Sequence, residues 1–251
     1  MYNLEVMYTL KNKDIGTGYN AGVRESYKND YEFNRWFIRS RNRAEYTMTY
    51  QAISERLKET NFSTALELGP GPGTWTRLLH RKNQNAELQL VDISEAMKEQ
   101  FELEMRELPN VTYTVTDIME YAPSEPYELF FSSRAVEYLD DKPGFFKKLG
   151  TFVKAGGNGM IVTKNPYHGI RKSGLDAHQG QIPMPEMKRM LEDNGFVDVA
   201  FYPAVVRIPI LSRLTSEVAE YILEKNLNQQ LNINATNRTI ESYVVTFTKP
   251  A

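Results

Sequence analysis

The stretch from Thr64 to Thr76, TALELGPGPGTWT, constrains the fold more than any other part of the chain. Residues 64–68 have the apolar pattern of a buried strand. Glycines at 69, 71 and 73 then alternate with prolines at 70 and 72, and Thr74 is a residue type that caps helix N-termini. The stretch therefore predicts a strand, a glycine-rich turn and the start of a helix.

A turn of this kind suits a bound ligand. Glycine has no Cβ and readily adopts positive φ, so the backbone can come close to a ligand. The following helix would offer unpaired N–H groups and the positive end of its dipole. The alternative is a glycine-rich turn that holds no ligand.

The glycine spacing differs from the dinucleotide fingerprint G-x-G-x-x-G, because the sixth position counted from Gly69 is Thr74. The chain instead reads E-x-G-x-G-x-G, with Glu67 two residues before the first glycine. This pattern resembles the first motif of the class I S-adenosylmethionine (SAM)-dependent methyltransferases. The resemblance implies that the loop lies under the methionine and ribose parts of the cofactor, with the following residues at the site: Glu67, Gly69, Pro70, Gly71 and Gly73.

Predicted strands and helices alternate after this loop, which is typical of an α/β domain with a mainly parallel sheet. Strands are expected at 87–91, 111–115, 127–131, 160–163, 196–201 and 242–248. Helices are expected at 44–60, after Ser94, from Pro143 to Gly156-Gly157, at 185–194 and at 216–226. The resemblance covers roughly 63–250. It implies a Rossmann-like seven-stranded sheet with an antiparallel last strand and helices on both faces.

Two acidic residues follow the second and third predicted strands. Asp92 comes about 20 residues after the glycine loop, where a carboxylate can accept hydrogen bonds from both ribose hydroxyls. The alternative is a helix-capping aspartate. Ile93 and Met97 would then flank the adenine. The resemblance also implies that Asp117 binds the adenine amino group while Ile118 packs on the ring.

The fourth strand ends on Phe131-Ser132-Ser133-Arg134, where many members of the resembled family carry an acidic residue or asparagine. Ser133 and Arg134 are therefore the candidates for contacts with the methionine end of the cofactor. The chain also lacks the Asn/Asp-Pro-Pro-Tyr tetrad of amino-methylating relatives. The similar Asn165-Pro166-Tyr167 follows the fifth strand instead.

Methyl transfer from a sulfonium is an in-line displacement in which positioning supplies much of the rate. An oxygen acceptor with a high pKa gains from a base that removes its proton. His168, which follows the fifth strand and has an ordinary pKa of about 6.5, is the first candidate. Glu137 is the second. The alternatives are a solvated loop histidine and a salt-bridged glutamate.

Residues 1–45 show no clear period and are rich in aromatic residues and arginines. They either pack on the core as a helical extension or form a lid whose arginines clamp a carboxylate or phosphate. The resembled family often closes this region over cofactor and substrate. We expect a lid at 1–60 and the SAM-binding domain at 61–251. The candidates for substrate contacts are Tyr19, Trp36, Arg39, Arg43 and Tyr167.

Composition narrows the class of protein. A net charge of -2 over 251 residues gives no field that favours nucleic acid or an anionic membrane. The lack of cysteine excludes disulfides, thiolate metal sites and cysteine nucleophiles, and no metal is predicted. The first residues do not read as a signal peptide, and no apolar run reaches the ~20 residues of a membrane span. A cytoplasmic location is therefore expected.

The sequence thus predicts a SAM-dependent methyltransferase that methylates oxygen on a small-molecule or glycan-type acceptor and releases S-adenosylhomocysteine. A monomer or homodimer is expected. One alternative is an NAD(P)-dependent oxidoreductase, disfavoured by Thr74 and by the lack of a Y-x-x-x-K pair near the fourth helix. The other is a methyltransferase-like binding protein without turnover. The residues do not identify the acceptor.

Overall fold

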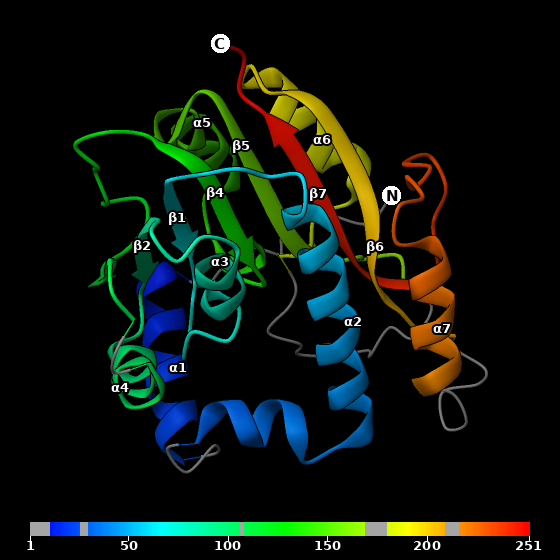
Figure 1. Cartoon of the computed structure of the whole chain (residues 1–251), viewed down its shortest axis with the longest axis horizontal. Helices are drawn as coiled ribbons and strands as arrows, with labels where there is room; N and C mark the ends of the chain where they lie inside the picture. The colour runs from blue at the N-terminus through cyan, green and yellow to red at the C-terminus, as the bar shows by residue number, and fades with distance from the viewer. Residues whose placement is uncertain (1–10, 26–29, 106–107, 169–179, 209–215) are drawn as a thin grey trace.

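The structure, a computed structural model, describes residues 11–25, 30–105, 108–168, 180–208 and 216–251. Its centre is one seven-stranded sheet (Figure 1). The strands are β1 (Thr64–Leu68), β2 (Glu87–Asp92), β3 (Val111–Val115), β4 (Tyr127–Ser133), β5 (Val153–Lys164), β6 (Val197–Val206) and β7 (Ile240–Thr248).

The strand order is β3-β2-β1-β4-β5-β7-β6. β1 to β5 pair in parallel, whereas β7 lies between β5 and β6 and is antiparallel to both. This confirms the predicted Rossmann-like sheet with its antiparallel last strand. The carboxyl ends of β1, β2 and β4 therefore meet at one edge of the sheet, where such folds bind ligands.

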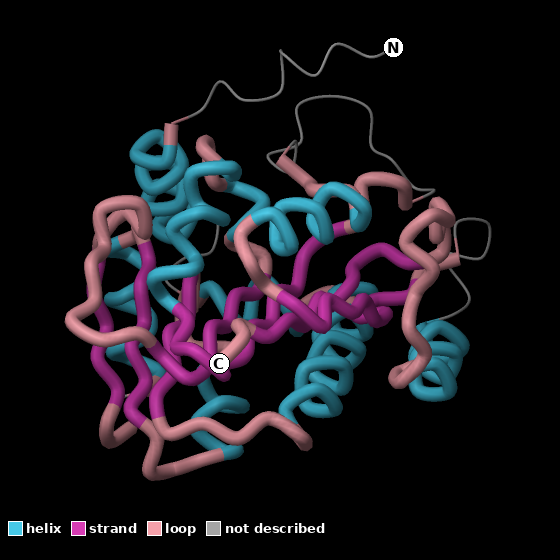
Figure 2. The backbone as a smooth tube through the Cα atoms, turned by 90° about the horizontal axis from the view of Figure 1, so that it is seen from above, coloured by secondary structure: helices cyan, strands magenta, loops and turns pink. Residues whose placement is uncertain are grey.

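Helices cover both faces of the sheet, as Figure 2 shows. The side chains of β4 alternate, so that Phe130 enters one core and Leu129 and Phe131 enter the other. The Phe130 core includes α5 (Lys142–Phe152) and α6 (Met184–Asp193), while the Leu129 core includes residues of α2 (Ser40–Leu57), α3 (Thr76–Lys82) and α4 (Glu95–Glu104). α7 (Ser216–Asn226) packs beside α2 and β6.

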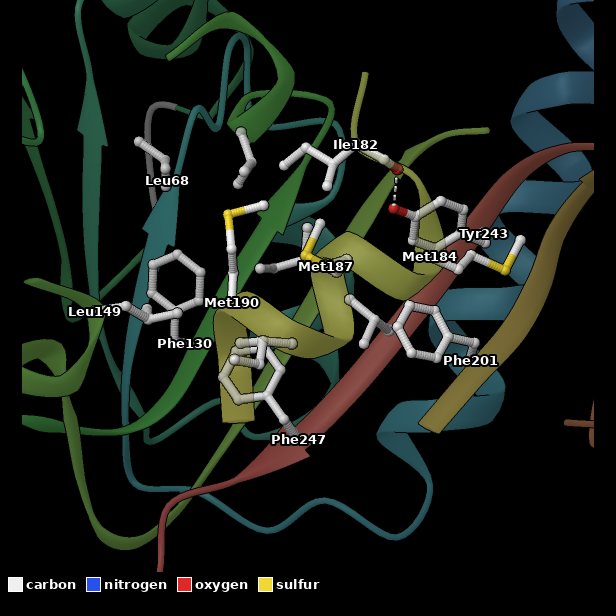
Figure 3. Close-up of a cluster of buried hydrophobic side chains, with 14 of the residues drawn as sticks. Leu68, Phe130, Leu149, Ile182, Met184, Met187, Met190, Phe201, Tyr243 and Phe247 are labelled. Carbon is white, nitrogen blue, oxygen red and sulfur yellow. Dashed lines mark hydrogen bonds between the residues drawn. The ribbon is translucent and has the colours of Figure 1, made fainter. Parts of the chain in front are cut away.

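The core beneath α6 is rich in sulfur and aromatic side chains. Met187 and Met190 of α6 lie in the same buried cluster as Phe130 and Phe247 (Figure 3). The buried hydroxyl of Tyr243 donates a hydrogen bond of 2.6 Å to the carbonyl of Ile182. This contact fixes the chain entering α6 to β7.

Two predicted boundaries are wrong. Thr74 does not cap α3, because the helix begins at Thr76 and Trp75 occupies the cap position without a side-chain hydrogen bond. Gly156 and Gly157 do not end α5 but lie inside β5, which starts directly after Phe152. Gly156 takes a φ of 75°, which only glycine adopts freely, so it suits an irregular strand.

The N-terminal part forms α1 (Asn12–Glu25), a short π-helix η2 (Phe33–Phe37) and then α2. α1 packs against α4, while Ala52, Ile53 and Leu57 of α2 belong to the core of the sheet. Of the aromatic residues among the first 45, Tyr2, Tyr8 and Tyr27 lie outside the described residues. None of the helices that the structure describes has the length and apolarity needed to cross a membrane.

Candidate cofactor and acceptor site

The glycine turn after β1 is built from three left-handed residues. Gly69, Gly71 and Gly73 have φ values of 69°, 56° and 89°. A Cβ on Gly69 would lie 2.4 Å from that of Ala135, and one on Gly73 would lie 2.8 Å from Cε of Met105. A Cβ on Gly71 would approach nothing closer than 3.7 Å. Packing inside the protein therefore demands glycine at 69 and 73, whereas Gly71 is required for its φ alone.

Glu67, two residues before the turn, has a buried side chain whose carboxyl accepts a 2.7 Å hydrogen bond from the hydroxyl of Thr76. Burial raises the pKa of Glu67 to about 8, and the nearby charge of Asp92 adds to the rise. The contact ties the end of β1 to the first residue of α3 and so holds the glycine turn between them.

Asp92 at the end of β2 faces the middle glycine. Its carboxylate accepts hydrogen bonds from the N–H groups of Gly71 (3.1 Å) and Ser94 (2.9 Å). Burial raises the pKa of Asp92, and these N–H donors oppose the rise. The hydroxyl of Tyr113 on β3 donates to the carbonyl of Gly71 (3.2 Å). Tyr113 was not predicted, but it helps to fix the turn.

Helix α1 covers the residues predicted to hold the adenine. The side-chain amide of Asn12 donates to both carboxylate oxygens of Asp117, at 3.1 and 2.9 Å. Gly16 lies against Ile93, because a Cβ there would be 3.2 Å from the isoleucine side chain. Val23 packs on Met97.

The same helix binds the start of α4 through Asn20, whose oxygen accepts from Ser94 Oγ (2.8 Å) and Ala96 N (3.0 Å). Ile118, predicted to pack on the adenine ring, lies in the hydrophobic core that contains Phe130. The adenine-side candidates are therefore brought together beneath α1, apart from Ile118, which lies deeper.

Arg134 follows the tip of β4 with a φ of 64°, a left-handed conformation that is uncommon outside glycine. Its Nε donates to Glu137 (2.7 Å) and its Nη1 to Glu45 of α2 (3.3 Å). Glu137, in the 3-10 turn Val136–Tyr138, also accepts from the hydroxyl of Thr163 (2.8 Å) and the N–H of Lys164 (3.2 Å). Hydrogen bonds from Arg134, Thr163 and Lys164 thus fix the position of the Glu137 carboxylate.

Glu45 lies at the centre of a buried charge cluster. Among the described residues, four cations lie within 4 Å of its carboxylate: Arg35, Arg134, Lys164 and Arg207. Lys164 and Arg207 also pair with Glu241 on β7. Burial acts to raise the pKa of Glu45, but the cations, Lys164 foremost, bring it below its ordinary value. The carboxylate therefore stays ionised inside the protein.

A cavity of about 10 Å³ lies beside this cluster, large enough for roughly one water molecule. Its walls come from η2, α2, the glycine turn and strands β4, β5 and β7. They are lined by Trp36, Glu45, Thr49, Trp75, Ser133, Arg134, Val162 and Ser242. Among the described residues, the buried hydroxyls of Ser133 and Ser242 have no hydrogen-bond partner.

The residues predicted to contact the substrate are dispersed. Trp36 lines the cavity, but Arg39 and Arg43 are exposed, and Arg43 donates to the carbonyl of Phe37 (3.1 Å). Tyr167 is 50% exposed. The side chain of Tyr19 lies outside the described part of the chain. Of these candidates, the structure places Trp36 next to Ser133 and Arg134.

His168, the first candidate base, lies just beyond β5. Its Nε2 is 3.3 Å from the carbonyl oxygen of Arg207. Burial lowers the pKa of His168, while the charge of Glu241 opposes the shift. The imidazole is therefore neutral at neutral pH, the form in which it can accept a proton.

Residues 65–157 match the family model described as "Methyltransferase domain". A malonyl-[acyl-carrier protein] O-methyltransferase from Ilyobacter polytropus is 29% identical over 136 residues, which are 51% of this chain and 52% of that protein. A trans-aconitate 2-methyltransferase from Yersinia pestis is 36% identical over 83 residues, which are 33% of this chain and 31% of that protein. The matched segments thus span about half, or less, of these curated relatives.

A solved structure shows the same fold. Phosphoethanolamine N-methyltransferase 2 of Haemonchus contortus, in complex with phosphomonomethylethanolamine and S-adenosylhomocysteine, superposes with a TM-score of 0.64 at 16% identity. The superposition covers 97% of this chain and 61% of that one. The sheet order and the glycine turn define a class I methyltransferase fold. The family match identifies residues 65–157 as a methyltransferase domain, and the curated relatives named above are methyltransferases.

Proposed function

We propose that this protein transfers the methyl group of SAM to an oxygen atom of a small-molecule acceptor and releases S-adenosylhomocysteine. The observation that carries the proposal is the half-buried carboxylate of Asp92 held 3.1 Å from the N–H of Gly71, at the carboxyl edge of the sheet. Glycine turns with positive φ at this edge let the backbone approach a cofactor, and the adjacent carboxylate suits a ribose.

The main predicted cofactor contacts have places in this proposal. Asp92 would accept hydrogen bonds from the ribose hydroxyls, and Gly71 would lie beneath the methionine chain. Asp117 would accept a hydrogen bond from the adenine amino group beneath α1. Ser133 and the charged Arg134 would lie near the methionine end. When bound, SAM supplies a methyl group already activated by its positive sulfur, so the protein mainly has to orient the acceptor.

Oxygen is the proposed acceptor atom because one relative is named as an O-methyltransferase and the other is named for trans-aconitate. A hydroxyl acceptor would need a base, and the neutral imidazole of His168 could serve. Glu137 suits that role less well, since Arg134 and Thr163 occupy its oxygens. We assign Glu137 to holding Arg134. A glycan-type acceptor stays a prediction.

Calorimetric titration with S-adenosylhomocysteine tests the proposal through Gly71→Val. A β-branched side chain at positive φ distorts the turn and fills the space above it. Gly156→Val is the matched control, because Gly156 also has a positive φ of 75° but lies in β5, and nothing lies within 4 Å of its Cβ position. We expect Gly71→Val to abolish binding and Gly156→Val to retain it.

Equal affinity of both variants and the unsubstituted protein would remove the glycine turn from the cofactor site. The same titration with NAD and NADP separates this function from the oxidoreductase alternative, which predicts binding of a dinucleotide and not of S-adenosylhomocysteine.

A further inference from the structure

Two buried hydroxyls point to a ligand in the cavity beside the charge cluster. Ser133 and Ser242 are 7% and 1% exposed, both line the cavity, and neither hydroxyl has a partner among the described residues. They come from β4 and β7, which are not neighbours in the sheet. Buried polar groups are nearly always hydrogen-bonded, so two unpartnered hydroxyls lining one cavity indicate that a polar ligand binds there.

The charged side chains around the cavity indicate the charge of that ligand. Arg35, Arg134, Lys164 and Arg207 pair with three carboxylates, those of Glu45, Glu137 and Glu241. These ion pairs join four cations to three carboxylates of the described residues. Cationic side chains beside a cavity favour an anionic ligand over a neutral one.

We propose that this cavity receives a carboxylate of the methyl acceptor and that Ser133, Ser242 and Arg134 select it; the proposal rests on the function proposed above. Two hydroxyl donors and a guanidinium match the acceptor lone pairs of a carboxylate. The cavity also adjoins Trp75, at the end of the glycine turn, so a carboxylate here lies beside the proposed cofactor site.

Carboxylate methylation also simplifies the chemistry. One carboxylate oxygen uses a lone pair to bond to the methyl carbon while the methyl–sulfur bond breaks, and that bonding pair stays on sulfur. The products are a methyl ester and S-adenosylhomocysteine. No proton moves, because the carboxylate is already ionised at neutral pH. This acceptor therefore needs no general base.

The cavity must widen to admit more than a single small group, and Trp36 is the wall that can move. It comes from η2 rather than from the sheet, and it packs edge-on against Trp75 with ring centroids 6.0 Å apart. The guanidinium of Arg35 lies 4.2 Å from the Trp36 ring centroid. A carboxylate that draws on these cations therefore also disturbs the indole.

Tryptophan fluorescence reports directly on this cavity, because the chain has two tryptophans and both line it. The experiment titrates the full-length protein with malonate, with and without saturating S-adenosylhomocysteine. Malonamide, which has the same skeleton without charge, is the control probe. We expect malonate to change the fluorescence saturably and malonamide not to do so.

Ser242→Ala tests the site itself, and Ser54→Ala is its matched control. Ser54 also has a buried hydroxyl without a partner, but it does not line the cavity. We expect Ser242→Ala to weaken malonate binding about tenfold, the loss of one hydrogen bond to a charged group. Ser54→Ala should bind malonate as the unsubstituted protein does, and S-adenosylhomocysteine affinity should be unchanged in both variants.

The proposal is overturned if malonamide binds as well as malonate, if malonate leaves the fluorescence unchanged, or if Ser242→Ala binds malonate as tightly as Ser54→Ala. Failure of S-adenosylhomocysteine to bind would contradict the proposed methyltransferase instead. The malonate titration without cofactor then still decides whether the carboxylate site exists.

Discussion

At the scale of single residues, the site depends on buried ionisable groups whose environments differ. Glu67 is surrounded by protein with one hydroxyl donor and has a pKa raised to about 8. Glu45 lies among four cations and has a lowered pKa. At neutral pH, Glu67 beneath the glycine turn is therefore protonated, whereas Glu45 beside the cavity is ionised.

Glu67→Gln is expected to make stability less dependent on pH. The folded protein holds the Glu67 proton more tightly than the unfolded chain, so wild-type stability falls as pH rises from the ordinary pKa of 4.5 to about 8. Glutamine cannot ionise, yet it can still accept from Thr76. Urea unfolding between these pH values should show a shallower loss for Glu67→Gln. Parallel curves would mean that Glu67 is ionised in the folded protein.

Asp92→Ala is expected to weaken SAM binding by ~1.5–3 kcal/mol, the range for hydrogen bonds to a charged group. The thermal midpoint should change little, because Asp92 ends a strand and binds backbone N–H groups of a turn. Calorimetry measures the first quantity and scanning calorimetry the second. Asp193→Ala, in an exposed i,i+4 pair with Arg189, is the control. A loss below about 0.3 kcal/mol would mean that the ribose is held elsewhere.

Site features formed by residues close in the sequence were predictable, whereas features formed by residues from distant segments were not. The glycine turn, the end of β2 at Asp92 and the Ser94 cap follow from local pattern, and Ser94 indeed accepts from the N–H of Met97. The charge cluster joins Glu45, Arg134 and Glu241, which are far apart along the chain. Only the completed sheet brings these segments together. Arg207 and Glu241, single charges beside apolar runs, were the available signal of buried pairs.

At the scale of elements, α1 is attached to the domain by polar contacts and by the packing of Val23 on Met97. Asn12 binds Asp117 through its amide nitrogen and the N–H of Asp140 (3.0 Å) through its oxygen. Asn20 binds the first turn of α4. A helix held by a few side-chain hydrogen bonds over a buried site is suited to opening and closing.

Asn12→Ala is expected to release α1 without unfolding the domain, because both Asn12 contacts are lost while the cores on the sheet remain. Limited trypsin digestion should cut after Lys13 and Arg24 faster in this variant, and S-adenosylhomocysteine should slow the cutting in the unsubstituted protein. Thr17→Ala is the control, since the Thr17 hydroxyl bonds within its own helix. Equal cutting of both variants, with or without cofactor, would contradict a lid role for α1.

At the scale of the whole molecule, one edge of the sheet brings together site residues that lie far apart in the sequence. The ends of β1, β2 and β4 supply the glycine turn, Asp92 and Arg134, while the antiparallel β7 brings Ser242 to the same region. The parallel alternation predicted this sheet. The antiparallel direction of β7 came from the family resemblance. Its placement between β5 and β6 was not predicted, since short strand patterns carry no information on pairing order.

The elements of the N-terminal 60 residues, predicted as a lid, lie in two different places. α2 contributes Ile53 and Leu57 to the core of the sheet and Glu45 to the charge cluster. α1 and η2 instead lie over the site. The aromatic density of the first 45 residues signalled packing against a surface, but it could not separate a helix of the core from a helix of a lid.

Methyl transfer by this protein can be measured in one reaction. The protein is incubated with SAM carrying a trideuteriomethyl group and, separately, with malonate and trans-aconitate, and the products are read by mass spectrometry. We expect a labelled monomethyl ester and an equal amount of S-adenosylhomocysteine. Protein that binds S-adenosylhomocysteine in the calorimeter but forms neither product above the protein-free control would contradict it.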